Sequence, residues 1–361
     1  MSYVEIDGVA KAFSGKPVLE GLSLGIEKGE ILALLGPSGS GKTTALRLLA
    51  GFETPDRGRI SVAGEDVTAL PPARRNFGMV FQHYALFPHM TAGENVAFGL
   101  ESRNAPGPEV ARRVAEALAL VELPHLADRK PGEMSGGQQQ RVAVARALAP
   151  EPRVLLLDEP LSNLDPSLRE RTRRELRSAI RRVGITTVLV THEQEEAFHL
   201  GDRIAVIAGG HLQQVGRPED LYERPATRFV AGFIGRSSAL SGTVERSAGE
   251  QVHVRLDAGP LWPGACLEPL AVGARVELIA RPEGLIFTAA PQTPGSVAGR
   301  IAERRYGSPW ATFTLVLENG SGTEVEVLAS PHAAAEGDRV GVQPLGSAPL
   351  PRVFPIGRSG V

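Results

Sequence analysis

The chain has 361 residues, of which 42% are apolar and 22% are charged, so it can bury a sizeable core and is long enough for two domains. Its 39 basic and 41 acidic side chains give a net charge of −2, which argues against bulk binding of nucleic acid. The single cysteine, Cys266, excludes an intrachain disulfide and a cysteine metal cluster, and it fits a reducing cytosol.

The sequence predicts neither a signal peptide nor a membrane span. The first residues, MSYVEIDGVAK, lack a charged start followed by an apolar stretch. No apolar run approaches the roughly 20 residues that cross a bilayer. We therefore expect a cytoplasmic protein whose membrane role comes through partners.

The first two thirds of the chain alternate short apolar strands with helices. ILALL at 31–35 is predicted to be a strand, and it leads into a helix over 42–51. VLLLD at 154–158 and TTVLVTH at 186–192 are near-continuous apolar runs, typical of parallel strands covered on both faces. A helix over 166–182 separates them. This alternation predicts an α/β core with a mostly parallel sheet.

A helical insertion is predicted within this core. Residues 109–123 have the spacing of an amphipathic helix with one apolar stripe, formed by Val110, Val114, Leu118 and Val121. Because this helix lies between two motifs of the core, we expect a helical subdomain over residues 85–150 or thereabouts.

The sequence pattern changes after residue 236. Helical periodicity fades, and alternating segments appear at 252–257, 275–280 and 312–329. In the last segment, Asn319-Gly320 and Ser321-Gly322 predict a hairpin turn. We predict an α/β domain over 1–236 and a small all-β domain, a barrel, over 237–361. The Pro and Gly residues within 341–361 predict a loosely ordered tail.

The loop GPSGSGKT follows the strand at 31–35 and precedes the next helix. It fits G-x-x-x-x-G-K-[ST] in the context that a phosphate-binding loop requires, which argues against a plain glycine-rich turn. Its glycines let backbone N–H groups face phosphate oxygens. Lys42 is placed to meet the β- and γ-phosphates, and the Thr43 hydroxyl to ligate Mg²⁺. The predicted nucleotide contacts are Gly36, Pro37, Ser38, Gly39, Ser40, Gly41, Lys42, Thr43 and Thr44.

Two later strand ends carry side chains that suit ATP hydrolysis. Asp158 ends a buried strand, where a carboxylate can hold magnesium through water. Glu159 follows and is placed to act as the general base on the attacking water, although Asp-Glu-Pro alone would also fit a turn. His192 comes just past another strand, at the edge where such sheets bind ligands, so we expect it to contact the γ-phosphate.

A second candidate anion site lies well downstream of the first. SGGQQQR at 135–141 opens a segment whose spacing and alanine content predict a helix. Ser-Gly-Gly at a helix start exposes backbone N–H groups to an anion. A single chain with one nucleotide has no evident need for two such sites.

The order of these motifs resembles that of ATP-binding cassette (ABC) ATPases. The resemblance covers residues 3–235 and rests on GPSGSGKT, Gln82 in MVFQHYALFPHMT, MSGGQQQR, LLLDEP, SNLD and the Thr-His pair. The whole layout is similar to the ATPase subunits of bacterial solute importers, whose extra domain is of the TOBE type. FVAGFIGR at 229–236 resembles the passage into that domain, and RPEG at 281–284 resembles a motif that recurs within it. The resemblance implies a P-loop NTPase core followed by an OB/TOBE-like β domain. Met134, where Leu is common, is the one visible departure, and we expect little consequence.

The resemblance also implies a homodimer with shared nucleotide sites. In that family two subunits stack head to tail, so that each ATP lies between one chain's phosphate loop and its partner's signature. Two helix N-termini that face one γ-phosphate would hold the subunits together until hydrolysis removes that anion. The signature residues here are Ser135, Gly136, Gly137 and Gln138.

Other family residues carry over one by one. Phe13 matches the aromatic that stacks on adenine, with an ordinary core phenylalanine as the alternative. Asp165 matches the aspartate that links the two sites, and it also fits a helix N-cap. Gln82 matches the glutamine that reaches the metal or the attacking water. The implied catalytic residues are thus Glu159, His192, Gln82 and Lys42, and the implied magnesium ligands are Thr43, Gln82 and Asp158.

Two segments allow more than one interpretation. HYALFPHM at 83–90 fits core packing, and by resemblance it also fits the groove that receives a helix of the membrane subunit. The seven arginines of 169–182 would suit nucleic acid, but Glu170 and Glu175 interrupt them and the chain is not basic, which favours a solvated helix face.

Together these features predict the ATP-hydrolysing subunit of a bacterial importer of a small solute. We expect a homodimer on the cytoplasmic face of the inner membrane, beneath two transmembrane permease subunits fed by an extracytoplasmic solute-binding protein. Ferric iron or polyamine is favoured as the solute. Sulfate, molybdate, thiamine and sugar stay open, because the ATPase does not touch the solute. The rivals are a non-transport ABC protein and a regulatory binding module.

Overall fold

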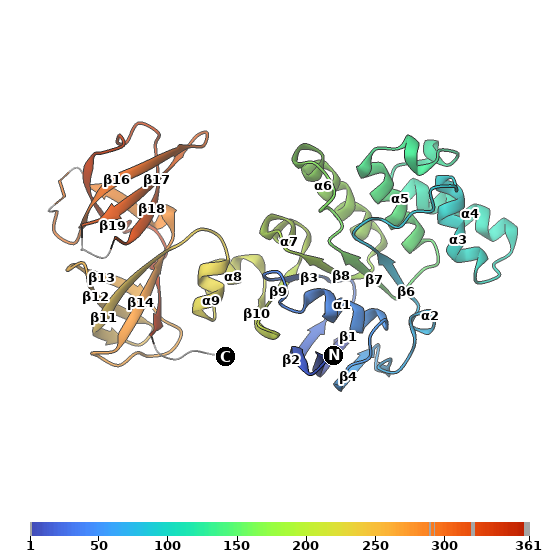
Figure 1. The fold of residues 1–361 in the computed structure, drawn as a ribbon, viewed down its shortest axis with the longest axis horizontal. Helices are drawn as coiled ribbons and strands as arrows, with labels where there is room; N and C mark the ends of the chain where they lie inside the picture. Colours follow the sequence, from blue (N-terminus) through green and yellow to red (C-terminus); the bar gives the residue numbers. More distant parts are fainter. Residues whose placement is uncertain (1, 289, 292, 319–321, 357–361) are drawn as a thin grey trace. The chain divides into compact units, whose positions relative to one another are not determined.

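The computed structural model describes residues 2–288, 290–291, 293–318 and 322–356 (Figure 1). The chain forms two compact units, Met1–Pro218 and Glu219–Val361. The sequence-based domain boundary at residue 236 lies later than this division. Helices α8 (Pro218–Glu223) and α9 (Arg228–Phe233), which the sequence assigns to the first domain, fall in the second unit.

The first unit is built on a six-stranded sheet in the order β10-β9-β3-β8-β7-β6. Its strands are parallel except β10, which is antiparallel to β9, so the predicted mostly parallel sheet is confirmed. Every side chain of β3 is buried, as expected for a strand covered on both faces. The bounds are β3 (Ile31–Leu35), β6 (Phe77–Val80), β7 (Val154–Asp158), β8 (Thr186–Thr191), β9 (Arg203–Ala208) and β10 (His211–Gly216).

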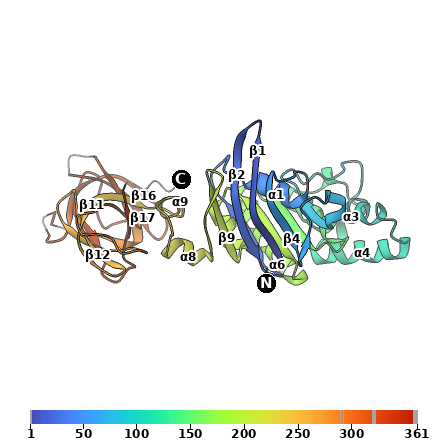
Figure 2. The same cartoon turned by 90° about the horizontal axis from the view of Figure 1, so that it is seen from below.

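A second sheet in this unit is antiparallel, in the order β2-β1-β4-β5. Figure 2 shows its long strands β1 and β2 beside helix α1. One apolar core joins both sheets to α1, so the helix that follows the phosphate loop is fixed from two sides. The bounds are β1 (Val4–Phe13), β2 (Lys16–Ile26), β4 (Arg57–Val62), β5 (Glu65–Asp66) and α1 (Lys42–Ala50).

Helices of the first unit fall into two groups. Helices α3 (Ala92–Glu101), α4 (Gly107–Leu120) and α5 (Gly136–Leu148) pack together within the predicted helical insertion. On α4 the predicted apolar stripe is largely buried, with Val114 partly exposed. Helices α6 (Pro166–Val183) and α7 (Gln194–Leu200) follow β7 and β8, and the short α2 (Pro72–Arg75) precedes β6.

The second unit combines a barrel with a further sheet. The closed barrel has the order β11-β12-β13-β20-β14, and the five-stranded sheet has the order β15-β19-β16-β17-β18. One core that includes Trp262 and Phe313 runs through both, so they fold as one body. The bounds are β11 (Ser238–Ala248), β12 (Gln251–Leu256), β13 (Leu261–Ala265), β14 (Arg275–Ala280), β15 (Leu285–Thr288), β16 (Val297–Tyr306), β17 (Ala311–Leu317), β18 (Glu324–Ala329), β19 (Arg339–Pro344) and β20 (Arg352–Pro355).

The predicted loosely ordered tail over 341–361 is wrong where two strands form in it, and its residues 357–361 lie outside the described residues. Residues 339–344 form β19 between β15 and β16, and residues 352–355 form β20, which closes the barrel against β14. The hairpin prediction is confirmed in its strands, because β17 and β18 pair antiparallel. Its turn residues 319–321 lie outside the described residues.

Arg281, in the RPEG segment, joins α8 and α9 to the strands of the second unit. Its guanidinium donates to the carbonyl oxygens of Ile234 at 2.6 Å, Arg236 at 3.1 Å and Tyr222 at 3.3 Å, and it stacks on the Tyr222 ring. Glu283 accepts a hydrogen bond from the Tyr222 hydroxyl. These contacts explain why α8 and α9 belong to the β unit.

Candidate active site

The phosphate loop connects the end of β3 to the start of α1. Space and backbone geometry require its glycines. A Cβ on Gly36 would lie 2.0 Å from the carbonyl oxygen of Ile207, and Gly41 has a left-handed φ of 103°. The helix that follows begins at Lys42 and ends at Ala50 with Gly51 as its C-cap, close to the predicted bounds. The loop therefore has the tight backbone curvature that lets N–H groups face an anion.

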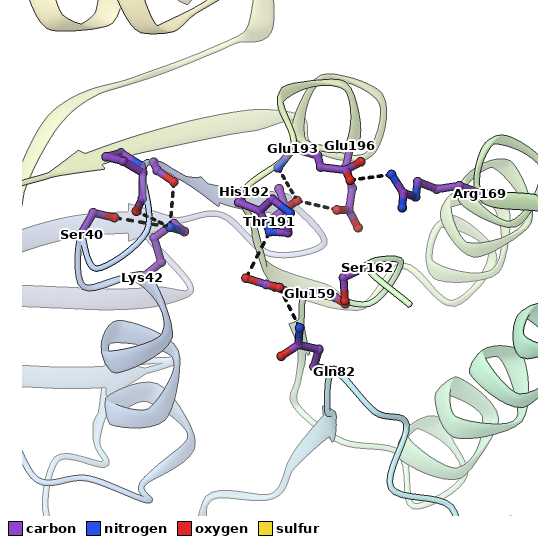
Figure 3. Close-up of polar contacts among 12 residues, drawn as sticks. Ser40, Lys42, Gln82, Glu159, Ser162, Arg169, Thr191, His192, Glu193 and Glu196 are labelled. Carbon is purple, nitrogen blue, oxygen red and sulfur yellow. Dashed lines mark hydrogen bonds and ion pairs between the residues drawn. The ribbon is translucent and has the colours of Figure 1, made fainter. Parts of the chain in front are cut away.

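Lys42 lies inside this loop and is only 6% exposed. Its Nζ donates to the carbonyl oxygens of Gly36 at 2.8 Å and Pro37 at 2.9 Å, and it lies 3.4 Å from Ser40 Oγ (Figure 3). Burial lowers the pKa of the Lys42 ammonium, and the negative charge of Glu159 acts in the opposite direction. The ammonium thus lies at the bottom of an anion site and faces the acidic side of the same site.

The end of β7 places two carboxylates side by side. Burial raises the pKa of Asp158, the adjacent Glu159 raises it further, and Arg47 opposes both. Glu159 has a left-handed φ of 44°, which is uncommon for a residue with a side chain and is a strained conformation. The Glu159 N–H donates to Val190 O at 3.0 Å, and the Ser162 hydroxyl donates to Glu159 O at 3.0 Å. These bonds hold the turn.

Three adjacent strands deliver side chains to one cluster. Gln82 follows β6, Glu159 follows β7 and His192 follows β8. Gln82 Nε2 donates to Glu159 Oε2 at 3.1 Å, and His192 Nδ1 lies 3.3 Å from Glu159 Oε1 (Figure 3). The carboxylate of Glu159 is therefore held on each oxygen by a different predicted site residue.

Asn163 supports this cluster, and the sequence reasoning missed its role. Its Nδ2 donates to the backbone oxygen of Gln82 at 2.5 Å and lies 3.1 Å from His83 Nδ1. Its place in SNLD, between Glu159 and Asp165, was the available signal. Glu196, a buried acid behind His192, was also missed. The structure buries it together with Ala197 and Leu200 on one face of α7, and the sequence carried no signal that set it apart from Glu193 and Glu195.

The signature residues form the N-terminus of α5. Ser135 Oγ accepts from the Gln138 N–H at 3.4 Å, and Gln138 Oε1 accepts from the Ser135 N–H at 2.9 Å, a reciprocal capping box. Ser135 is exposed, whereas Met134 before it is buried. A Cβ on Gly137 would approach Thr172 Oγ1 to 2.9 Å, so this glycine permits close packing against α6.

The segment after Gln82 is tied to the signature helix. Arg146 of α5 donates to the carbonyl oxygens of Ala85 at 2.7 Å and Tyr84 at 2.9 Å, and it lies over the Phe87 ring. In HYALFPHM only the tyrosine side chain is buried. Core packing thus explains part of this segment and leaves the rest at the surface.

The remaining predicted residues lie at the surface. Phe13, at the end of β1, is 41% exposed with Lys11 Nζ 5.3 Å from its ring centre, so the interpretation as a core phenylalanine is wrong. Asp165 is the N-cap of α6, since its Oδ1 accepts from the Leu168 N–H at 3.0 Å. A hydrogen bond from the Ser167 hydroxyl lowers the pKa of Asp165.

The arginine-rich helix is α6, and its charges are paired. Each of its seven arginines lies within 4 Å of a carboxylate. Arg173 is buried at 5% exposure, so the expected solvated face holds for the other six and not for this one. The partners are Glu193, Glu175, Glu195, Glu170, Asp202 (with two arginines) and Glu122.

The structure brings together one half of the predicted nucleotide site. Loop 36–44, Asp158, Gln82, Glu159 and His192 gather at the carboxyl ends of the parallel strands. In the described part of the chain, no hydrogen bond or ion pair joins Ser135 or Gln138 to that loop. Within one chain the signature is thus a separate surface.

The chain is similar to several known proteins. A family model described as "ABC transporter" matches residues 19–162. A spermidine/putrescine import ATP-binding protein of Frankia alni is 49% identical over 341 residues, which cover 90% of this chain and 72% of that protein. The chain belongs to the ABC transporter ATPase family. The resemblance inferred from the motifs is therefore confirmed.

Further relatives of the ABC ATPase agree. Spermidine/putrescine import ATP-binding proteins of Pseudomonas aeruginosa and Shigella dysenteriae are 48% and 46% identical; each alignment covers 88% of this chain, and 88% and 84% of those proteins. A solved ATP-binding cassette, dimeric in a post-hydrolysis state with ADP and Pi, is 34% identical. Its TM-score is 0.52, over 59% of this chain and 98% of that one. The predicted P-loop NTPase fold and the ABC-type ATPase activity are thus established.

Proposed function

We propose that this ABC ATPase energises the import of polyamines of the spermidine and putrescine type through a membrane transporter. The observation that carries the proposal is the 46% to 49% identity to spermidine/putrescine import ATP-binding proteins over 322 residues or more. Since the first unit ends at Pro218, these alignments extend well into the β unit. The relatives do not favour ferric iron, sulfate, molybdate, thiamine or sugar, nor a non-transport role.

The residues at the strand ends fit a nucleotide with magnesium. The loop has no space for a side chain at Gly36, and the buried Lys42 ammonium faces into it. Thr43, Asp158 and Gln82 offer the oxygen ligands that magnesium prefers. Among the described residues no cluster of three His, Cys, Asp or Glu side chains could hold a metal ion. When bound, magnesium would neutralise charge on the β- and γ-phosphates.

Glu159 is the proposed general base. Gln82 and His192 each hold one of its carboxylate oxygens, so its orientation is fixed before the water arrives. The carboxylate would orient the water and take its proton as the new P–O bond forms and the bond to ADP breaks. Lys42 would steady the charge on the phosphates, and His192 would contact the γ-phosphate.

We propose that the second half of each site comes from another copy of the chain. Ser135 is exposed at the N-terminus of α5, where backbone N–H groups and the helix dipole favour an anion. Capping-box bonds already fix this turn, so little ordering is needed when it meets a phosphate. Gly136, Gly137 and Gln138 would complete the contact, Phe13 would stack on adenine, and Asp165 would link the two sites.

An aromatic surface near Gln82 is the proposed contact with the permease. Phe52, Phe81 and Phe98 are each at least 39% exposed. Phe52 packs 6.2 Å from Phe81, and Phe87 packs 4.6 Å from Phe98, measured between ring centres. Because Gln82 lies in the same segment, a helix docked here would sense the state of Glu159.

No helix in the described residues is long and apolar enough to cross a bilayer. We propose that the chain attaches at the cytoplasmic face through two permease subunits fed by a solute-binding protein.

Uptake measurements on a gene deletion test this function. Deletion of the gene in its own host should reduce uptake of labelled spermidine and putrescine at least about tenfold and leave ferric iron, sulfate and thiamine uptake unchanged. The wild-type gene should restore uptake, and the Glu159→Gln variant should not. Unchanged polyamine uptake, with loss of another solute's uptake, would overturn the assignment.

A further inference from the structure

A buried acid lies directly behind the strand end that carries His192. Glu196, on α7, is 2% exposed. Its Oε2 accepts a hydrogen bond from the Thr191 hydroxyl at 2.5 Å (Figure 3). Its Oε1 is buried and has no hydrogen-bond partner among the described residues. Burial of a carboxyl group with so few hydrogen bonds costs free energy of folding. The function of its one hydrogen bond, to Thr191, therefore needs an explanation.

The Thr191 hydroxyl closes a turn around His192. It donates to Glu196 and accepts from the Glu193 N–H at 3.0 Å. Because Thr191 and Glu193 flank His192 in sequence, this hydroxyl fixes the backbone on both sides of the histidine. Thr191 itself is 1% exposed, so water does not compete for these bonds.

A second tie reaches the same turn from α6. Arg169 Nη1 donates to Glu193 Oε1 at 2.5 Å, and its Nη2 donates to Leu164 O at 2.9 Å (Figure 3). The His192 turn is therefore held by α7 through Glu196 and by α6 through Arg169. The hydrogen bond to Glu196 is the one that lies fully inside the protein.

We propose that Glu196 is a positioning residue for ATP hydrolysis, which acts through the Thr191 hydroxyl to hold the His192 ring beside Glu159. The inference rests on the proposed roles of Glu159 and His192. The 3.3 Å contact of His192 Nδ1 with Glu159 depends on the direction in which the turn presents the ring. A small rotation of that turn would break it.

The protonation of Glu196 does not remove this role. Burial raises its pKa to about 7, and Glu193 adds to the shift, whereas Thr191, Arg173 and His192 oppose it. Arg169, on the same side, is engaged by Glu193. A carboxyl oxygen accepts a hydrogen bond in both the neutral and the ionised form. A glutamine keeps this acceptor, and a methionine of similar length removes it.

The test compares matched variants of the full-length chain. Glu196→Met and Thr191→Val each remove the hydrogen bond, Glu196→Gln keeps it, and Glu195→Gln changes an exposed neighbour on the same helix. We expect kcat to fall about tenfold in Glu196→Met and Thr191→Val with the KM for ATP unchanged. The double variant should lose no more than Thr191→Val alone, because that change already removes the hydrogen bond to Glu196 together with the one from the Glu193 N–H. Glu196→Gln and Glu195→Gln should stay within about twofold of wild type.

A second readout separates this inference from the proposed function. NMR signals of the His192 ring, assigned with a His192→Gln variant, should shift in Glu196→Met and stay in place in Glu196→Gln. A wild-type kcat together with unshifted ring signals in Glu196→Met would overturn the positioning role, as would equal losses in the Gln and Met variants. If the wild-type chain hydrolyses no ATP, the proposed function fails, and the ring signals still decide whether Glu196 positions His192.

Discussion

The two units of the chain place their charged side chains differently. In the first unit Lys42 and Glu196 are buried, and the half-buried Glu159 has a strained backbone. In the second unit the ion pair of Arg255 with Glu245 lies at the surface, with side chains 50% and 45% exposed, over an apolar core. Burial of a charged side chain costs free energy of folding, and such side chains are frequent at functional sites. The difference indicates that the chemistry belongs to the first unit.

This comparison makes a general prediction. Changes at the proposed general base of the first unit, Glu159, should alter turnover more than stability, whereas changes in the core of the β unit should alter stability more than turnover. The predictions below test this contrast from the largest expected effect to the smallest.

Glu159→Gln should have the largest effect. Loss of a general base lowers kcat by about 10² to 10⁴, and the amide keeps the shape of the side chain, so the thermal midpoint should change little. Phosphate release and thermal melting measure the two quantities. The matched control is Glu245→Gln in the β unit, which should hydrolyse ATP like wild type. Normal turnover in Glu159→Gln would remove this residue from the base role.

Phe313→Ala should show the reverse pattern. Phe313 is 0% exposed in the core of the second unit, so its truncation should cost about 3–5 kcal/mol of that unit's unfolding free energy. Turnover measured below the unfolding transition should stay within about twofold of wild type. Urea unfolding and phosphate release check this. A parallel fall in kcat would show that hydrolysis depends on the β unit.

Glu196→Gln should alter how stability depends on pH. The pKa of Glu196 is raised from 4.5 to about 7 in the folded protein. The native state then binds the proton more tightly than the unfolded state, so wild-type stability should fall as pH rises from 4.5 to 7. At pH 8 the glutamine variant should be more stable by about 3 kcal/mol, from 2.5 pH units at 1.36 kcal/mol each. Denaturant unfolding of the variant and of wild type at pH 4.5 and pH 8 measures this. The same difference in unfolding free energy at both pH values would contradict the prediction.

Arg255→Ala should have the smallest effect. Exposed ion pairs contribute about 1 kcal/mol or less, so the unfolding free energy of the β unit should change within that range, and kcat should not change. The same urea titration and phosphate-release assay suffice. A loss comparable to that of Phe313→Ala would mean that surface charge, and not the apolar core, stabilises this unit.

The sequence predicted those parts of the site that depend on local geometry. The phosphate loop needs glycine at positions such as Gly36, where a side chain would collide with Ile207. The glycine pattern can therefore be recognised from the sequence alone. Gln82, Glu159 and His192 each follow a strand, and parallel strands end at one edge. Their convergence was therefore predictable, although their roles stay predictions.

The sequence did not predict what depends on long-range packing. Glu196 is one of several glutamates at the start of the short helix α7, and its sequence context does not distinguish it from them. It is buried only because α7 packs against β3 and β8. The strands β19 and β20 occur among Pro and Gly residues, and β20 has only four residues. Both become strands by pairing with β14, β15 and β16, which precede them by many residues.

The central claim is that each ATP is shared between one chain's phosphate loop and the signature of another. Sedimentation of full-length Glu159→Gln with saturating MgATP tests it most directly, alongside the same variant carrying Ser135→Arg. We predict a dimer with ATP, a monomer with ADP, and no dimer in the Ser135→Arg variant. A monomer at saturating ATP, or a dimer unaffected by Ser135→Arg, would contradict the account.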